Sequence, residues 1–172
     1  GMDGGKVTVT PYGAPPPRVT APATRGTDEP LHVFYAGHLT QRKGMAYLLR
    51  ALERLDVPWT LSLAGPAPRH CPAPLRRLLA DPRCRALGHV PHETLLDAMT
   101  RAHVFVFPSI VEGFGMVLYE AMAAGLPVVT TPHTAGPDIL THGHDGFVVP
   151  IRDPDAIATH LGALAADEDR RR

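Results

Sequence analysis

Apolar and polar residues follow one another along the chain in a repeating order of strand and then helix, beginning at about Leu31. Short apolar runs rich in Val, Phe and Leu, bounded by glycine or proline, are typical of buried parallel strands. We expect strands at residues 33–36, 60–64, 85–87, 104–107, 128–130 and 147–149. Stretches of helix-forming residues follow these runs, and we expect helices at residues 44–54, 74–80, 92–101, 116–124, 137–141 and 154–166.

This alternation predicts an α/β fold, a Rossmann-like doubly wound parallel sheet of about six strands with helices on both faces. Ligands of such sheets bind outside the carboxyl ends of the strands. The loops expected at those ends are residues 37–43, 65–68, 108–115 and 132–137. A binding site is therefore expected at this edge of the sheet.

The first thirty residues have a different composition from the rest. Six prolines and several glycines make a continuous element implausible there, although the pattern at residues 7–9 is that of a short strand. Gly1 and Met2 resemble the remnant of a cleaved tag. We therefore divide the chain into a tag remnant with a proline-rich interdomain linker region, residues 1–30, and one domain, residues 31–172.

Composition narrows the possible functions. Seventeen basic and seventeen acidic residues cancel, which argues against binding to nucleic acid or anionic lipid. No apolar run is long enough to cross a membrane and no signal-peptide pattern opens the chain, so we expect a cytoplasmic protein. Cys71 and Cys84 are expected to be reduced thiols, and His142 and His144 lack a third metal ligand nearby. We expect no metal site.

The most informative segment runs from Glu112 to Glu120. It follows the strand expected at 104–107, turns at Gly113 and Gly115, and continues into a helix. A glycine turn that opens a helix leaves backbone N–H groups unpaired, and these favour an anion such as phosphate. The helix is apolar almost all round, so we expect it to be buried. Its only charged residue, Glu120, then needs a partner.

The two glutamates cannot both contact a phosphate, because like charges repel. Glu120 lies about one turn into the helix, where it could accept hydrogen bonds from a ribose next to the bound phosphate. Glu112 would lie on the other side, near a hydroxylated group carried by the phosphates. The spacing therefore indicates a nucleotide-sugar site. Either glutamate alone also fits a solvated or ion-paired surface residue.

The spacing of Glu112 and Glu120 resembles the E-x7-E motif of retaining glycosyltransferases, above all glycosyltransferase family 4 (glycosyl transferases group 1). The resemblance runs from about Val7 to Asp155. Further segments of the chain are also similar to the family: Gly37-His-Leu-Thr-Gln-Arg-Lys-Gly44, Leu63-Ala-Gly65, Leu87-Gly-His-Val-Pro91, Glu120-Ala-Met-Ala-Ala-Gly-Leu-Pro127 and Gly146-Phe-Val-Val-Pro150. It implies that the chain is the C-terminal, donor-binding half of a GT-B fold. The N-terminal, acceptor-binding half would then lie outside this chain.

The resemblance also implies an activity. Such enzymes transfer a sugar, here of the hexosyl type, from a UDP- or GDP-linked donor with retention of configuration and without a metal ion or other cofactor. The partners implied are the nucleotide-sugar donor and the N-terminal domain of the same polypeptide, through which the protein could be peripheral to a membrane. This chain alone would then be inactive. The nucleobase, the donor sugar and the acceptor stay open.

Site residues follow from the same resemblance. Glu112 corresponds to the catalytic glutamate, which holds donor-sugar hydroxyls. The family's two basic diphosphate ligands fall at His38, where relatives often have Arg, and at Lys43; a neutral imidazole offers one donor where guanidinium offers a charged fork. The donor-binding residues implied are Gly37, His38, Lys43, Phe114, Gly115, Met116, Val117 and Glu120. Those implied for the nucleobase are Gly65, His89 and Val90.

Other functions fit less well. A dinucleotide-dependent oxidoreductase would need Gly-x-Gly-x-x-Gly after the first strand, and residues 37–42 lack it. A flavodoxin-type regulatory module would need acidic residues at the end of the first strand, where Ala36 and Gly37 stand. A nucleotide-sugar epimerase of GT-B architecture and a non-catalytic nucleotide-binding module remain open.

Overall fold

One parallel sheet organises the domain. The computed structural model describes residues 13, 16–17, 23–26 and 29–171, so the strand expected at residues 7–9 lies outside the described residues. The sheet has the order β3-β2-β1-β4-β5-β6, and all neighbours pair in parallel. Its strands are β1 (Leu31–Ala36), β2 (Trp59–Ala64), β3 (Cys84–Gly88), β4 (Val104–Phe107), β5 (Val128–Thr130) and β6 (Gly146–Val148). The six predicted strands and the Rossmann-like fold are thereby confirmed.

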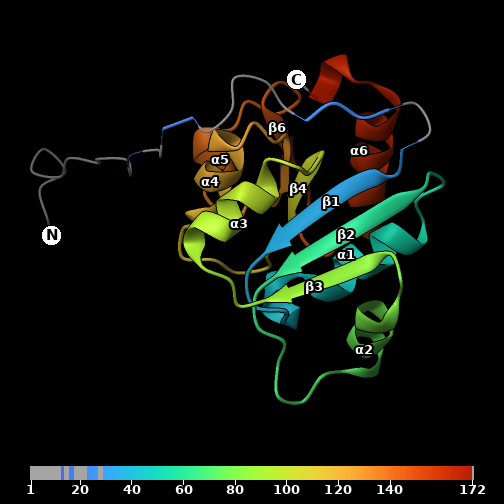
Figure 1. Cartoon of the computed structure of the whole chain (residues 1–172). Coiled ribbons are helices and arrows are strands. Elements are labelled where there is room, and N and C mark those ends of the chain that lie inside the picture. Colours follow the sequence, from blue (N-terminus) through green and yellow to red (C-terminus); the bar gives the residue numbers. More distant parts are fainter. Residues whose placement is uncertain (1–12, 14–15, 18–22, 27–28, 172) are drawn as a thin grey trace, which may run out of the picture.

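Helices cover both faces of this sheet (Figure 1). Helix α1 packs against α2 and α6, and α3 packs against α4. Their bounds are α1 (Met45–Glu53), α2 (Ala73–Ala80), α3 (His92–Met99), α4 (Val117–Ala123), α5 (Gly136–Ile139) and α6 (Pro154–Ala166). Two short 3-10 turns, η2 (Gln41–Lys43) and η3 (Asp169–Arg171), were not expected from the pattern.

The burial of each strand explains how clearly it could be predicted. All four residues of β4 are buried, as expected for a central strand with helices on both faces. Strand β3 lies at the edge, and its Arg85 and Ala86 are exposed. Its sequence therefore carries little of the apolar signal that marks the other strands.

Helix α4 is less buried than its composition suggests. Within it only Leu118 and Ala121 are fully buried, and Met116, just before its first turn, is 40% exposed. The expectation of a buried helix was thus wrong in part. The reason is position: α4 begins at the carboxyl edge of the sheet, where Met116 and Val117 line a cavity.

Two histidines form a polar cluster at the opposite, amino-terminal edge of the sheet. The buried Nδ1 atom of His103 accepts a hydrogen bond from the backbone N–H of His32 at 2.9 Å. The Nε2 atom of His32 lies 2.8 Å from the hydroxyl of Ser62. Burial lowers the pKa of both imidazoles. The folded protein therefore favours neutral histidines here.

This cluster predicts a loss of stability in mild acid. An unfolded histidine takes up a proton near pH 6.5, whereas His103 in the folded state resists it, so the free energy of unfolding should fall as pH drops below about 6.5. Urea denaturation at pH 7.5 and 5.5 measures this difference. In His103→Asn the amide oxygen can replace the Nδ1 acceptor but cannot titrate, so its pH dependence should be smaller. Equal pH dependence in both proteins would contradict the assignment.

Candidate functional site

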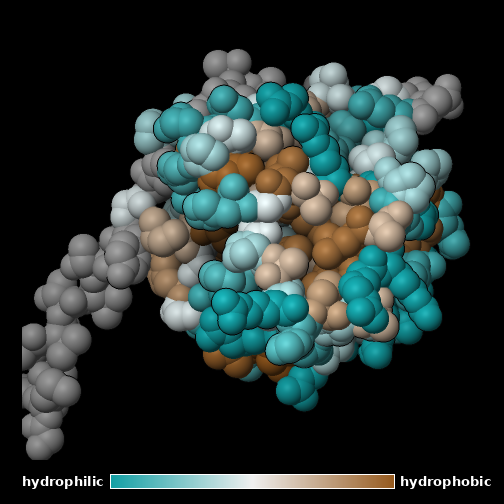
Figure 2. Space-filling model, turned by 60° about the horizontal axis from the view of Figure 1, so that its bottom comes forward, coloured by the Kyte–Doolittle hydropathy of each residue, from teal (hydrophilic) through white to brown (hydrophobic). Residues whose placement is uncertain are grey.

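A cavity of about 680 Å³ opens at the carboxyl ends of strands β1 to β4. Figure 2 looks toward this side of the molecule, and the surface is hollowed where hydrophobic and hydrophilic residues meet. Eleven of the twelve predicted site residues line the cavity: Gly37, His38, Lys43, Gly65, His89, Val90, Glu112, Gly115, Met116, Val117 and Glu120. Residues separated by more than 80 positions in the sequence are therefore brought to one place.

The sheet order creates this cavity. The chain runs from β1 outward to β2 and β3, then returns to the other side of β1 to form β4. The loops after β1 and β4 consequently leave the sheet in opposite directions, and a crevice remains between them. The loop after β1 carries Lys43, and the loop after β4 carries Glu112.

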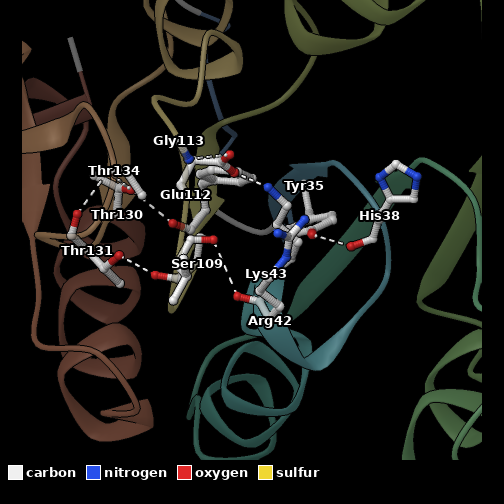
Figure 3. Close-up of polar contacts among 12 residues, drawn as sticks. Tyr35, His38, Arg42, Lys43, Ser109, Glu112, Gly113, Thr130, Thr131 and Thr134 are labelled. Carbon is white, nitrogen blue, oxygen red and sulfur yellow. Dashed lines mark hydrogen bonds and ion pairs between the residues drawn. The ribbon is translucent and has the colours of Figure 1, made fainter.

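Lys43 and Glu112 form an ion pair across this crevice (Figure 3). The ammonium Nζ donates to Oε2 of Glu112, and the other carboxylate oxygen accepts from the backbone N–H of Gly113 at 3.0 Å. Lys43 is only 8% exposed, and its Nζ lies 5.4 Å from the centre of the Phe107 ring. A charge buried to this degree requires a partner, and the carboxylate supplies one.

Tyr35 supports the floor of the site without adding charge. Its hydroxyl donates to the backbone carbonyl of His38 at 2.9 Å (Figure 3). Burial, together with the neighbouring Glu112 carboxylate, raises the pKa of this phenol well above its usual range. Tyr35 therefore stays neutral and holds the loop after β1 in place.

The start of helix α4 offers hydrogen-bond donors to the cavity. Its first intrahelical bond runs from the N–H of Leu118 to the carbonyl of Gly115 at 3.0 Å. No described residue accepts from the N–H groups of Gly115, Met116 and Val117. The predicted unpaired donors are therefore present beside the cavity.

Glu120 has a partner that the sequence did not indicate. Its carboxylate Oε1 lies 3.0 Å from Nε2 of His92, at the start of α3, and its side chain is 20% exposed. Both residues line the cavity. The expectation that Glu120 needs a partner is confirmed. A histidine directly after Val90-Pro91 was the available signal for that partner.

The loop after β4 is fixed on two sides (Figure 3). On one side, the N–H of Ile110 donates to the carbonyl of Arg42 at 2.9 Å. On the other, the hydroxyl of Thr131 donates to the carbonyl of Ser109 at 2.5 Å. A third contact joins Ala135 N–H to the carbonyl of Phe114 at 2.6 Å. The loop that carries Glu112 is thus held at several points along its backbone.

Phe114 is the one predicted site residue that does not line the cavity. Its ring stacks on Tyr119, with centres 5.8 Å apart, and packs against the core. The helical turn that follows directs the side chain of Phe114 away from the crevice. Only a backbone role near the ligand remains consistent with its position.

Two glycines pack loops together and do not open room for a ligand. A Cβ atom on Gly44 would lie 1.9 Å from the carbonyl oxygen of Pro108. A Cβ atom on Gly65 would lie 2.1 Å from the carbonyl oxygen of Gly37. At both glycines the close approach is therefore between two backbones.

The remaining candidates lie at the rim. His38 is exposed, and its ring lies apart from the Lys43–Glu112 pair (Figure 3). His89 is exposed and Val90 half-buried, both after the edge strand β3. Arg42 does not line the cavity, so Lys43 is the only lysine or arginine among the described lining residues.

Metal sites and membrane spans are both absent from the described residues. These residues contain no group of three or more His, Cys, Asp or Glu side chains placed to hold a metal ion. They also contain no helix that is long and apolar enough to cross a membrane. Cys71 and Cys84 are free thiols.

Comparison with known proteins decides the family. The family described as glycosyl transferases group 1 matches residues 30–167, which include every residue of the cavity. This chain belongs to the glycosyl transferases group 1 family. An uncharacterized glycosyltransferase of Methanocaldococcus jannaschii is 33% identical to this chain over 144 residues, which cover 81% of this chain and 37% of that relative.

Solved structures agree on the fold. The lipopolysaccharide outer core galactosyltransferase WaaB in its apo form superposes with a TM-score of 0.76 at 25% identity, covering 90% of this group 1 chain and 46% of WaaB. HepE of Anabaena, solved with UDP and glucose, superposes with a TM-score of 0.73 at 24% identity, covering 84% of this chain and 41% of HepE. The chain thus spans less than half the length of these proteins and matches the Rossmann-like architecture of GT-B enzymes.

The backbone contact at Gly44 predicts a mutational difference. Gly44 and Gly143 have similar backbone angles, with φ of 78° and 83°, but nothing lies within 4 Å of a Cβ atom on Gly143. In Gly143→Ala the free energy of unfolding should fall by about 1–2 kcal/mol, because alanine is strained in the left-handed conformation. Gly44→Ala should lose roughly 1–3 kcal/mol more, because its methyl group overlaps Pro108. Chemical denaturation of both variants measures the difference, and equal losses would contradict the contact.

Proposed function

We propose that this chain is the donor-binding half of a family 4 glycosyltransferase that transfers a hexosyl group from a nucleoside diphosphate sugar to an acceptor. The observation that carries the proposal is the cavity at the strand ends, where Lys43, the free amides before α4 and two glutamates meet. Its volume of about 680 Å³ lies within the range of small-molecule sites. The family match supports the reaction class.

The order of the strands suggests how the donor lies. Lys43 and the N–H groups of residues 115–117 meet where β1 and β4 diverge, and these donors suit a diphosphate. Val90 and His89 follow β3, which is an edge strand two strands away from β1, and they suit the nucleobase. The donor would therefore extend from β4 toward β3.

In this arrangement one glutamate would contact the ribose and the other the transferred sugar. Glu120 lies one turn into α4 beside His92 and would accept from ribose hydroxyls. Glu112, which is paired with Lys43, would accept from the hydroxyls of the transferred sugar. Lys43 and the backbone donors would neutralise the leaving diphosphate, so the proposal includes transfer without a metal ion. Retention of configuration is part of the proposal through the resemblance to the E-x7-E motif.

The acceptor side belongs to the second half of the enzyme. The chain spans 37% of its archaeal relative and 46% of WaaB, so we infer that an N-terminal, acceptor-binding domain of the same polypeptide closes over this cavity. We propose a cytoplasmic location for the full polypeptide, with a peripheral membrane contact through that N-terminal domain. A non-catalytic nucleotide-binding module would bind the same nucleotide but would not transfer sugar with that domain present.

The ribose assignment can be tested by titration calorimetry. Glu120→Gln should weaken binding of the preferred nucleoside diphosphate, chosen among UDP, GDP and ADP, by roughly 1–3 kcal/mol, the scale of a charged hydrogen bond. Inorganic pyrophosphate, which has no ribose, should bind both proteins equally. Glu93→Gln removes the same charge from an exposed position of α3 outside the cavity and serves as control. Equal losses of binding free energy for pyrophosphate and for the nucleotide would show that Glu120 does not contact the ribose.

The need for a second domain predicts that the 172-residue chain binds donor without using it. With UDP-glucose or GDP-mannose and a mixture of sugar acceptors, release of nucleoside diphosphate should stay at the uncatalysed level. Joining this chain to the N-terminal half of its own polypeptide should restore transfer, and chelation of divalent cations should not abolish it. Rapid turnover by the chain alone would show that the acceptor site is already present.

A further inference from the structure

Glu112 occupies the place that an anionic ligand would take. Its carboxylate contacts the ammonium of Lys43, which is the only lysine or arginine among the described residues lining the cavity. Both side chains are largely buried, at 10% and 17% exposure. The cation proposed to bind the diphosphate is therefore already paired with a carboxylate of the protein.

The pair cannot stay unchanged when a diphosphate binds. A phosphate placed at Lys43 would lie within a few ångströms of the Glu112 carboxylate, and two anions at that distance in a partly buried site repel strongly. The second oxygen of Glu112 is also engaged, with the N–H of Gly113 at 3.0 Å. To reach sugar hydroxyls, Glu112 must therefore turn away from Lys43.

The ion pair is not required to hold the two loops together. The same loops are joined by hydrogen bonds from Ile110 N–H and the Ser109 hydroxyl to the carbonyl of Arg42, at 2.9 and 3.3 Å. They are also joined by the close packing of Gly44 on Pro108. A purely structural role for the pair would be redundant with these contacts. Glutamine at residue 112 keeps an oxygen that can accept from Lys43, so Glu112→Gln should leave the fold intact.

We propose that Glu112 is an internal competitor for Lys43 that makes the site prefer a nucleotide sugar over the sugar-free nucleotide. When the ligand carries a sugar, the displaced carboxylate finds hydroxyl donors that offset the loss of Lys43. When the ligand is a bare nucleoside diphosphate, the carboxylate finds none and returns to Lys43, which weakens the diphosphate. Glu112 thus favours donor entry and release of the nucleotide product.

This inference rests on the proposed function, and one set of titrations tests both. Wild type, Glu112→Gln and the exposed control Glu93→Gln are titrated with inorganic pyrophosphate, UDP and UDP-glucose, or with GDP and GDP-mannose if the guanine nucleotide is preferred. Removing the competing charge in Glu112→Gln should tighten pyrophosphate and the bare nucleotide by roughly tenfold. The nucleotide sugar should bind no more tightly than before, so the preference for it over the bare nucleotide should shrink by about the same factor. Glu93→Gln should behave as wild type.

The outcomes separate the two proposals. If nucleotides bind but Glu112→Gln leaves pyrophosphate and UDP unchanged or weaker, the competition is wrong while the donor site stands. If Glu112→Gln tightens pyrophosphate but no protein binds any nucleotide, Glu112 competes with an anion for Lys43, but the proposed function falls and the preference for a nucleotide sugar falls with it. Circular dichroism and the urea midpoint of Glu112→Gln confirm that the variant is folded. The inference would be overturned if Glu112→Gln is folded and the ratio of its affinity for the nucleotide sugar to its affinity for the bare nucleotide is the same as in wild type.

Discussion

The site depends on the pairing of β4 with the side of β1 opposite to β2. This one choice of neighbour sends the loops after β1 and β4 in opposite directions and leaves a crevice between them. Every charged group of the proposed chemistry is reached from that crevice: Lys43 from one wall, Glu112 and Glu120 from the other. If β4 had followed β3 at the sheet edge, the same residues would lie several strands apart, with no shared cavity.

Backbone contacts convert this crevice into a rigid site. Gly44 against Pro108 and Gly65 against Gly37 bring three loops into direct contact, at distances that admit no side chain. Hydrogen bonds to the carbonyls of Arg42 and Ser109 fix the loop between them. Preorganised donors of this kind bind a charged ligand without having to reorganise, which is the main source of electrostatic stabilisation in enzymes. Side chains such as Glu112 are then the movable parts.

The sequence predicted the sheet well because the central strands are buried on both faces. Strands β4 and β5 are continuous Val- and Phe-containing runs, and their bounds were predicted to the residue. Strand β3 is exposed at the edge, so polar residues such as Arg85 obscured it and only its middle was expected. The η2 turn was missed because three polar residues before a glycine carry no periodic signal.

The positions of most site residues could be predicted, but their pairings could not. Loops at strand ends share one edge in any parallel sheet, which was enough to gather Lys43, Glu112 and Glu120. The contact between Lys43 and Glu112 joins residues 69 positions apart and depends on side-chain geometry that no spacing rule contains. The contact of His92 with Glu120 was missed for the same reason, as was the stacking of Phe114 on Tyr119, which keeps the Phe114 side chain out of the cavity lining.

The way in which the loop after β4 is held has a consequence for how such enzymes can diversify. Because carbonyls at Ser109 and Phe114 are both bound to the segment after β5, the length of the loop between them is fixed, and an inserted residue would break several contacts at once. The segment after β3 is held at its start, where the N–H of Gly65 donates to the carbonyl of Gly88 at 2.7 Å, but the residues that follow, His89 and Pro91, are exposed. On the proposed placement of the donor, the nucleobase preference can therefore change by substitution near residues 89–91, while the part of the site proposed for phosphate and sugar keeps its length and shape.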